Sequence, residues 1–338
     1  MTNQGKGARG KRLWLGPVVY TGMACMLGSC SAMRVDLGTR VELDKVQVAK
    51  IEAKLMKGPG IAPGQRIPLV VTLTEPNGAV LQTEGKGGGK VMWKELQVVG
   101  TLVSVDEKGN VSLPEDARES DGKTGHVAVT VPSHSDLRAE LDIQVRHDFD
   151  FVADLSGAPG ANGLSGLDGA NGTSGTNGSI DANNPSAGGN GANGTNGDDG
   201  HNGWPGGDVP MVEVLIGLRD LGRPMLQAKV KAAGTERFYL VDTQGGTLTV
   251  KADGGPGGSG GRGGQGGQGG TGGSGIPPGF SGTRGMDGSK GWDGPMGKGG
   301  LITVRYDPTV TPYLKLIHVS SRNGPAPLYH QESVAAVW

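Results

Sequence analysis

Cysteine is almost absent from this 338-residue chain, which contains only Cys25 and Cys30. So few thiols exclude a fold held together by several disulfides, cysteine-based metal sites and thiol catalysis.

The chain also lacks a convincing set of catalytic or metal-binding residues. Residues 257–261 satisfy the G-x-S-x-G pattern, but they lie inside a glycine repeat, without the strand and helix of a nucleophile elbow. The six histidines show no metal-ligand spacing. Asp148, Asp150 and Asp154 are calcium candidates, although they follow no EF-hand pattern. The sequence predicts a protein that is not an enzyme and uses no cofactor.

Glycine, in contrast, is abundant, with 66 residues, and it recurs at every third position in four runs. We number them by position: run 1 is 157–178, run 2 is 188–206, run 3 is 254–275 and run 4 is 279–300. Run 3 doubles its glycines and reads Gly-Gly-X. This period predicts polyproline II helices, because such a helix has three residues per turn and places every third residue in one straight row.

A polyproline II helix has no internal hydrogen bonds, so its backbone groups must pair with water or with a neighbour. A neighbour can approach closely only along a row without side chains, which makes each glycine row a docking edge. Run 3 has two such rows, and we therefore predict that it lies centrally, flanked by the other three runs.

Two assemblies fit this pattern, a collagen-like trimer and a bundle formed within one chain. Collagen-like trimers are rich in proline, whereas run 1 has only Pro159 and run 2 only Pro205. The four runs also match in length, roughly 60–70 Å each, and are separated by turn-forming residues. The sequence favours a monomeric bundle of four helices. A homotrimeric stalk is the alternative, and a disordered linker is the third interpretation.

The runs resemble the polyglycine II bundles of Gly-X-X antifreeze proteins and of some phage tail-fibre adhesins, and they also resemble bacterial collagen-like surface proteins. The resemblance covers about 100 of the 338 residues. It implies a rigid, extended display module and brings no particular ligand site with it.

The N-terminus predicts export and lipid anchoring. Residues 1–29 have the pattern of a signal peptide, in which an apolar stretch at 13–27 follows four basic residues: Lys6, Arg9, Lys11 and Arg12. The sequence Leu27-Gly28-Ser29-Cys30 resembles the bacterial lipobox, which implies cleavage before Cys30 and a lipid on its sulfur. Ser31 follows, and this resemblance then implies sorting to the outer membrane. Cys25 is the weaker candidate for lipidation.

Charge argues against nucleic acid as a partner. Cleavage after residue 29 removes four of the 32 basic residues and none of the 33 acidic ones, which moves the formal net charge from −1 to −5. An acidic chain repels a phosphate backbone. The partners that we expect are the membrane, through the lipid on Cys30, and a polysaccharide or another component of the cell envelope.

The remaining segments predict a mainly β protein with two further domains. After a tether at 30–38, residues 39–150 alternate short apolar segments with turn clusters, and stretches such as 105–111 and 125–131 resemble bacterial Ig-like β-sandwiches. Runs 1 and 2 lie in 151–208, and runs 3 and 4 lie in 254–300. The insert 209–253 and the tail 301–338 are expected to pair in a small antiparallel sheet or sandwich.

One row of run 2 is the candidate ligand-facing surface. It repeats short polar residues about 9.3 Å apart: Asn190, Asn193, Asn196, Asp199 and Asn202. Trp204 and Trp292 offer stacking surfaces that could add to such a site. This row predicts either binding to a polysaccharide or ice, or local capping of exposed backbone amides. The sequence as a whole predicts a non-enzymatic, lipid-anchored surface protein with a structural or adhesive role.

Overall fold

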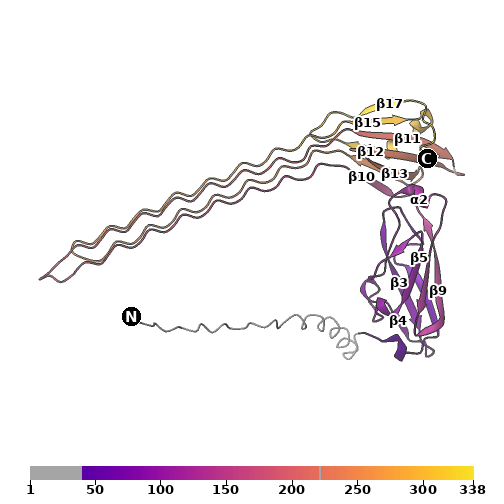
Figure 1. Cartoon of the computed structure of the whole chain (residues 1–338), viewed down its shortest axis with the longest axis horizontal. Helices are drawn as coiled ribbons and strands as arrows, with labels where there is room; N and C mark the ends of the chain where they lie inside the picture. The colour runs from indigo at the N-terminus through magenta and orange to yellow at the C-terminus, as the bar shows by residue number, and fades with distance from the viewer. Residues whose placement is uncertain (1–39, 221) are drawn as a thin grey trace, which may run out of the picture. The chain divides into compact units, whose positions relative to one another are not determined.

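The computed structural model describes residues 40–220 and 222–338 and is mainly β, as the sequence predicts (Figure 1). The expected signal peptide, Cys30 and the tether lie outside the described residues. The chain divides into two compact units. The first comprises Arg66–Ser112, Gly125–Gln144 and the described residues up to Gly60. The second comprises Ile61–Gln65, Leu113–Thr124 and Val145–Trp338.

The first unit contains two sheets. One has the order β1-β3-β7-β6, with β4 also paired to β3, and the other has the order β2-β9-β8-β5. The strands are β1 (Lys50–Leu55), β2 (Gly60–Ile61), β3 (Arg66–Thr74), β4 (Val80–Gln82), β5 (Gln97–Thr101), β6 (Ser104–Val105), β7 (Asn110–Ser112), β8 (Gly125–Val131) and β9 (His134–Val145). Three short 3₁₀ helices connect them: η1 (Leu43–Lys45), η2 (Gly85–Gly87) and η3 (Trp93–Glu95).

Alternation of apolar and polar residues explains why these segments form strands. In β8 the buried residues Val127, Val129 and Val131 alternate with partly exposed ones, because successive side chains of a strand point to opposite faces of the sheet. Strand β8 pairs antiparallel with β5 and β9. Strand β1 pairs antiparallel with β3 along its whole length, from Lys50 to Leu55.

The second unit also has two sheets, of orders β10-β14-β16 and β13-β12-β11-β15-β17. Their strands are β10 (Asp150–Asp154), β11 (Val212–Asp220), β12 (Pro224–Ala232), β13 (Thr235–Asp242), β14 (Thr247–Lys251), β15 (Ile302–Tyr306), β16 (Ile317–Ser320) and β17 (Leu328–Gln331). The short helix α2 (Ala117–Ser120) and the 3₁₀ helix η4 (Pro308–Leu316) complete the unit. The core includes Phe151, Val214, Leu248 and Val304, all nearly inaccessible to solvent.

The four glycine runs lie side by side and project from these sheets (Figure 1). Runs 1 and 3 are parallel, as shown by Gly166 N–H donating to Arg262 O at 2.8 Å. Runs 2 and 4 are parallel, and Gly200 N–H donates to Ser289 O at 2.9 Å. Antiparallel backbone bonds join run 2 to run 1, run 3 to run 2 and run 4 to run 3.

Each of the five contacts between runs is served by one glycine row. A Cβ added at Gly163 would overlap with His201 O, so the glycine row of run 1 admits run 2. The row of run 2 admits run 3, and the row of run 4 admits run 2. Run 3 supplies two rows, since a Cβ at Gly261 would overlap with Leu164 O in run 1 and one at Gly263 with Gly288 O in run 4.

Run 3 thus bonds to the other three runs, and so does run 2, although run 2 has a single glycine row. One row suffices for run 2 because runs 1 and 4 supply the glycines at two of its three contacts. The glycine period alone does not reveal this, since a run can have more neighbours than its own glycine rows.

The strands and runs of the second unit form three successive layers. The first contains β10, runs 1 and 2 and β11, the second contains β14, runs 3 and 4 and β15, and the third contains β16 and β17. The same offset of 97 residues relates β10 to β14 and run 1 to run 3, and the offset of 90 relates β11 to β15 and run 2 to run 4. In the third layer β16 pairs with β14 and β17 pairs with β15, both in parallel. In this third layer the short connection 321–327 joins the two strands, whereas a pair of glycine runs joins them in each of the first two layers.

Two expectations need correction. The insert and the tail do not meet in an antiparallel way, because β11 and β15 continue the parallel runs 2 and 4 and are therefore parallel themselves. The division of the chain also differs from a boundary at residue 150. Segments 61–65 and 113–124 belong to the second unit. The second of these segments places Arg118 over the ring of Phe238, with its guanidinium carbon 3.5 Å from the ring centroid.

The rule of one glycine row per contact predicts the effect of a single methyl group. Gly264→Ala should lower the free energy of unfolding by about 2 kcal/mol or more, because the new Cβ overlaps with Leu167 O and the runs must separate. Chemical denaturation followed by circular dichroism measures the change. The neighbouring Gln265→Ala is the control, since Gln265 is exposed and should change stability little. Equal stability of the two variants would contradict the rule.

Candidate functional site

The surface of the glycine runs is built from rows of short polar side chains that cap the backbone of the parallel neighbour. From run 1, four side-chain oxygens accept amide N–H groups of run 3 at 2.7–3.0 Å: those of Asn162, Asp168, Asn171 and Asn177. Each pair is 97 residues apart in the chain. These bonds satisfy amides that no backbone acceptor of the runs reaches.

The predicted ligand-facing row of run 2 has the same role toward run 4. Asn196 Oδ1 accepts the amide N–H of Met286 at 2.8 Å. The other members accept in the same way from Phe280, Thr283, Ser289 and Trp292, and they are Asn190, Asn193, Asp199 and Asn202. The sequence predicted local capping, and this is wrong, because each acceptor serves an amide 90 residues away. One oxygen of every side chain in the row is thus already engaged.

A third row, on run 4, closes the outer face of run 3. Asp293 and Asp287 accept the amide N–H groups of Gly260 and Gly266, each at 2.8 Å. Between and beside them, Arg284 pairs with Asp287 and Lys290 with Asp293. The N–H of Gly260 and the Lys290 ammonium lower the pKa of Asp293. On this face of run 3, side chains of run 4 therefore accept the amide N–H groups, and no further glycine run docks there.

The two candidate tryptophans belong to different rows. Trp204 lies on run 2 beside run 1, and its amide N–H donates to Ala161 O at 2.8 Å. It borders a shallow hollow whose lining includes Asn162, Leu164, His201, Asn202 and Pro205. Trp292 lies on run 4, where its carbonyl accepts from Gly203. Both indoles are largely exposed. The hollow at Trp204 combines an aromatic side chain with amide and imidazole groups.

The calcium candidates do not converge on a common point. Asp148 pairs with Arg146, which lowers the pKa of that carboxyl, while Asp150 accepts the Thr247 hydroxyl at 2.7 Å. The side chain and the amide N–H of Ser156 lower the pKa of Asp154, whose carboxylate accepts that N–H at 3.0 Å. Within residues 40–220 and 222–338, no group of three or more histidine, cysteine, aspartate or glutamate residues could hold a metal ion.

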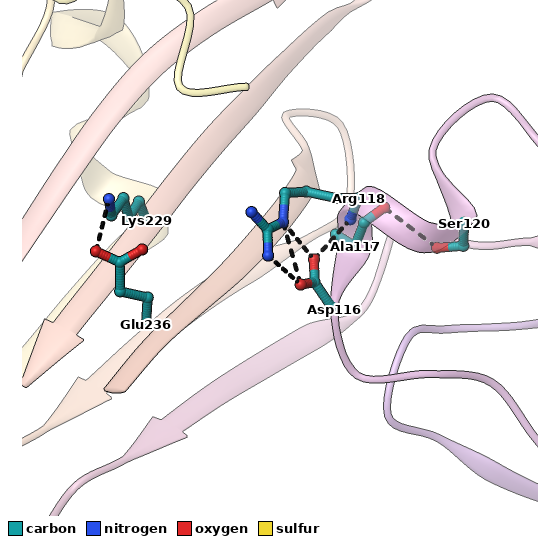
Figure 2. A network of polar contacts seen from close by, with 6 residues as sticks. All are labelled: Asp116, Ala117, Arg118, Ser120, Lys229 and Glu236. Atoms are coloured by element: carbon teal, nitrogen blue, oxygen red, sulfur yellow. Dashed lines mark hydrogen bonds and ion pairs between the residues drawn. The ribbon is translucent and has the colours of Figure 1, made fainter. Parts of the chain in front are cut away.

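A cluster of polar and aromatic side chains attaches segment 113–124 to the sheet that contains β13, β12 and β11. The sequence did not indicate this cluster. Asp116 caps α2 and holds Arg118, whose guanidinium lowers the pKa of the Asp116 carboxyl (Figure 2). Lys229 and Glu236 form an ion pair between β12 and β13 (Figure 2). Trp338 packs its edge on Phe238, with ring centroids 5.8 Å apart.

Beside this cluster lies a set of buried charges. Asp121 accepts the indole N–H of Trp338 at 3.0 Å and pairs with Arg219. Asp242, only 2% exposed, pairs with Arg223 at 2.6 Å. His147 is buried, and Nδ1 of its ring has no hydrogen-bond partner among the described residues. Burial lowers the pKa of His147. These contacts join residues far apart in the chain, so no local pattern in the sequence could reveal them.

Two further observations bear on function. No helix among the described residues is long and apolar enough to cross a membrane. No protein-family model matches the sequence, and the search of curated proteins finds no similar chain.

The capping role of the run 2 row predicts a loss of stability on truncation. Asn196→Ala should lower the free energy of unfolding by about 1 kcal/mol, because the amide of Met286 loses its acceptor. Asn196→Asp is the matched control and should be tolerated, since Asp199 caps Ser289 in the equivalent position. Amide hydrogen exchange at Met286 reports the bond directly. Unchanged exchange in Asn196→Ala would show that the row is free for another role.

Burial of His147 predicts a dependence of stability on pH. Burial disfavours the protonated ring and lowers its pKa in the folded protein, whereas the unfolded chain protonates near the ordinary pKa of 6.5. Stability should therefore be full above this value and fall as the pH drops below it. His147→Gln should flatten the change in Tm between about pH 7.5 and 5.5, a window well above the titration of the aspartates with lowered pKa. A slope identical to that of the native protein would assign the effect to other groups.

Proposed function

We propose that this chain is a non-enzymatic, lipid-anchored cell-surface protein that displays a stiff bundle of four polyproline II helices in a structural or adhesive role. The observation that carries this proposal is the hydrogen-bond network between the runs. Their glycine amides bond to carbonyls in the same chain along the whole length of the runs, for example Gly166 to Arg262 and Gly288 to Gly264. A segment bonded in this way is a rigid element.

The three-residue period and the absence of bonds within each run support the assignment to polyproline II geometry. At about 3.1 Å per residue, a 22-residue run extends about 68 Å. The continuous offsets of 97 and 90 residues tie the base of the bundle to a buried β core. We infer that the first unit, with its two sheets, is the Ig-like domain that carries this module.

A collagen-like trimer receives less support than a single-chain bundle. In a trimer, the glycine amides would bond to the other chains. Here runs 1 to 4 provide those acceptors themselves, and the turns between them bring the runs together. A repetitive surface that binds polysaccharide remains the second candidate function. The hollow beside Trp204 favours it, because the exposed indole offers an apolar face bordered by polar groups, against which a sugar ring could stack.

Anchoring rests on Leu27-Gly28-Ser29-Cys30, the lipobox-like sequence. We propose that Cys30 carries the lipid and that the protein is held at the outer membrane. Two acyl chains or more are needed for stable attachment, which a lipoprotein anchor supplies. The acidic exported chain is not expected to bind nucleic acid.

Lipid attachment gives a direct test. When the gene is expressed in a Gram-negative host, the protein should incorporate labelled palmitate and partition into the detergent phase. Cys30→Ser should abolish both properties, because the thiol that accepts the lipid is lost, while Cys25→Ser should leave both intact. If Cys30→Ser still carried label, the anchoring part of the proposal would be wrong. Far-UV circular dichroism of the same preparations reports the polyproline II signal of the bundle.

A further inference from the structure

One row of run 4 exposes large apolar side chains at regular intervals. We name it the apolar row; its members are Pro277, Phe280, Thr283, Met286, Ser289, Trp292 and Pro295. Their carbonyls accept the glycine amides of run 2, from Gly188 to Gly206, at 2.8–3.0 Å. The side chains of Phe280, Met286 and Trp292 are 79%, 75% and 81% exposed. They stand six residues apart, about 19 Å along the run.

These three side chains are not needed to hold the bundle together. Run 4 is attached through its backbone and through the glycine rows, and the apolar side chains point away from those contacts. Exposing phenylalanine, methionine and tryptophan on one edge costs solubility without adding to the fold. Residues of these types are enriched in the buried centre of protein interfaces. The row therefore has the composition of a contact surface.

The apolar row reads almost the same in both directions. Met286 is the centre of the row, and a hydroxyl residue lies three residues away on either side, namely Thr283 and Ser289. An aromatic residue lies six residues from Met286 on either side, namely Phe280 and Trp292, and a proline lies nine residues away on either side. Such a row is complementary to itself when two copies lie antiparallel. Self-complementarity is the property that a two-fold symmetric dimer requires, because the same patch must serve both partners.

We propose that a second copy of this chain packs antiparallel on the apolar row, with a two-fold axis at Met286. Phe280 then meets Trp292 of the second copy, and Met286 meets its own equivalent. The small residues Thr283 and Ser289 leave room for the large side chains to lie along the row. Aromatic pairs of this kind add stabilisation beyond the area that they bury.

The flanking rows are compatible with this arrangement. On one side, Arg284 is offset along the run by one residue, about 3.1 Å, from Asp287 of the second copy. The two-fold axis repeats this contact, so opposite charges come together twice. On the other side lies the row of run 2, where Asp199 comes opposite Asn193 of the second copy and Asn196 opposite its equivalent. No aspartate faces an aspartate directly across the axis. Charge complementarity of this kind fixes the register of an interface.

Run 1 and run 2 also expose apolar residues, namely Leu164, Leu167 and Trp204. The row of run 1 is nearly symmetric too, since Leu164 and Leu167 are flanked by Ala161 and Ala170, but it carries only two large apolar side chains and no aromatic residue. That surface therefore offers fewer large apolar side chains than the apolar row and no aromatic pair. It provides a matched control, because Leu167 is 74% exposed, almost as much as Met286.

Sedimentation equilibrium of the full chain in density-matched detergent tests the proposal, since it reports the mass of protein alone. We expect a reversible equilibrium between monomer and dimer. Met286→Glu should weaken the dimer about 30-fold or more, because the substitution places two carboxylates together at the axis. Leu167→Glu should leave the equilibrium unchanged. A monomer at every concentration, a trimer, or a dimer that tolerates Met286→Glu would overturn the proposal.

A charge exchange tests the antiparallel register independently of the proposed anchoring and adhesion. Phe280→Lys and Trp292→Glu should each weaken the dimer. The double variant should recover a substantial part of it, because the introduced ammonium of one copy would then face the introduced carboxylate of the other at both ends of the row. In a parallel dimer the double variant would place like charges together and dissociate further, which would overturn the two-fold arrangement. Circular dichroism confirms that each variant retains the bundle.

Discussion

The arrangement of the four glycine runs follows from the need to satisfy a backbone that bonds to nothing within its own run. A run without internal hydrogen bonds must find partners for its N–H and C=O groups elsewhere, and each neighbour that accepts them must come within hydrogen-bonding distance. Five contacts between runs therefore require five rows without a Cβ, and the four runs provide five. Run 3 supplies two of these rows through its doubled glycines, and each of the other runs supplies one.

The parallel sheets solve the problem of register. A glycine run has no side-chain pattern that distinguishes one triplet from the next, so its alignment with a neighbour could slip by three residues. Strands β10 and β14 carry buried side chains, such as Phe151 and Leu248, and a slip would move them out of the core. Because runs 1 and 3 follow directly after β10 and β14, the core fixes the offset of 97 residues, and the two runs keep the same offset. The side-chain caps at Asn162 and Asp168 repeat the same offset farther out.

The sequence predicts what is periodic and misses what is not. The mainly β content, the limits of the runs and several strands are evident from spacing and alternation alone. The alternation of the runs even implies parallel pairing of the strands that follow runs 2 and 4, so the expected antiparallel sheet conflicted with an order already visible in the sequence. The row of asparagines is visible too, but not its partner 90 residues away. The cluster around Asp121, His147 and Trp338 has no period, because it joins segments that only folding brings together.

A bundle held by its backbone also changes what an exposed side chain means. In an ordinary helix or strand, an apolar residue is first explained by the core that it helps to form, and only an apolar patch at the surface calls for a partner. In runs 1 to 4 the positions other than glycine do not build a core, and their common structural task is to cap amides, which short polar residues do. Phe280, Met286 and Trp292 cannot cap an amide and are not buried. Their presence at a fixed interval is therefore not explained by folding, and contact with another molecule is the remaining physical reason to retain them.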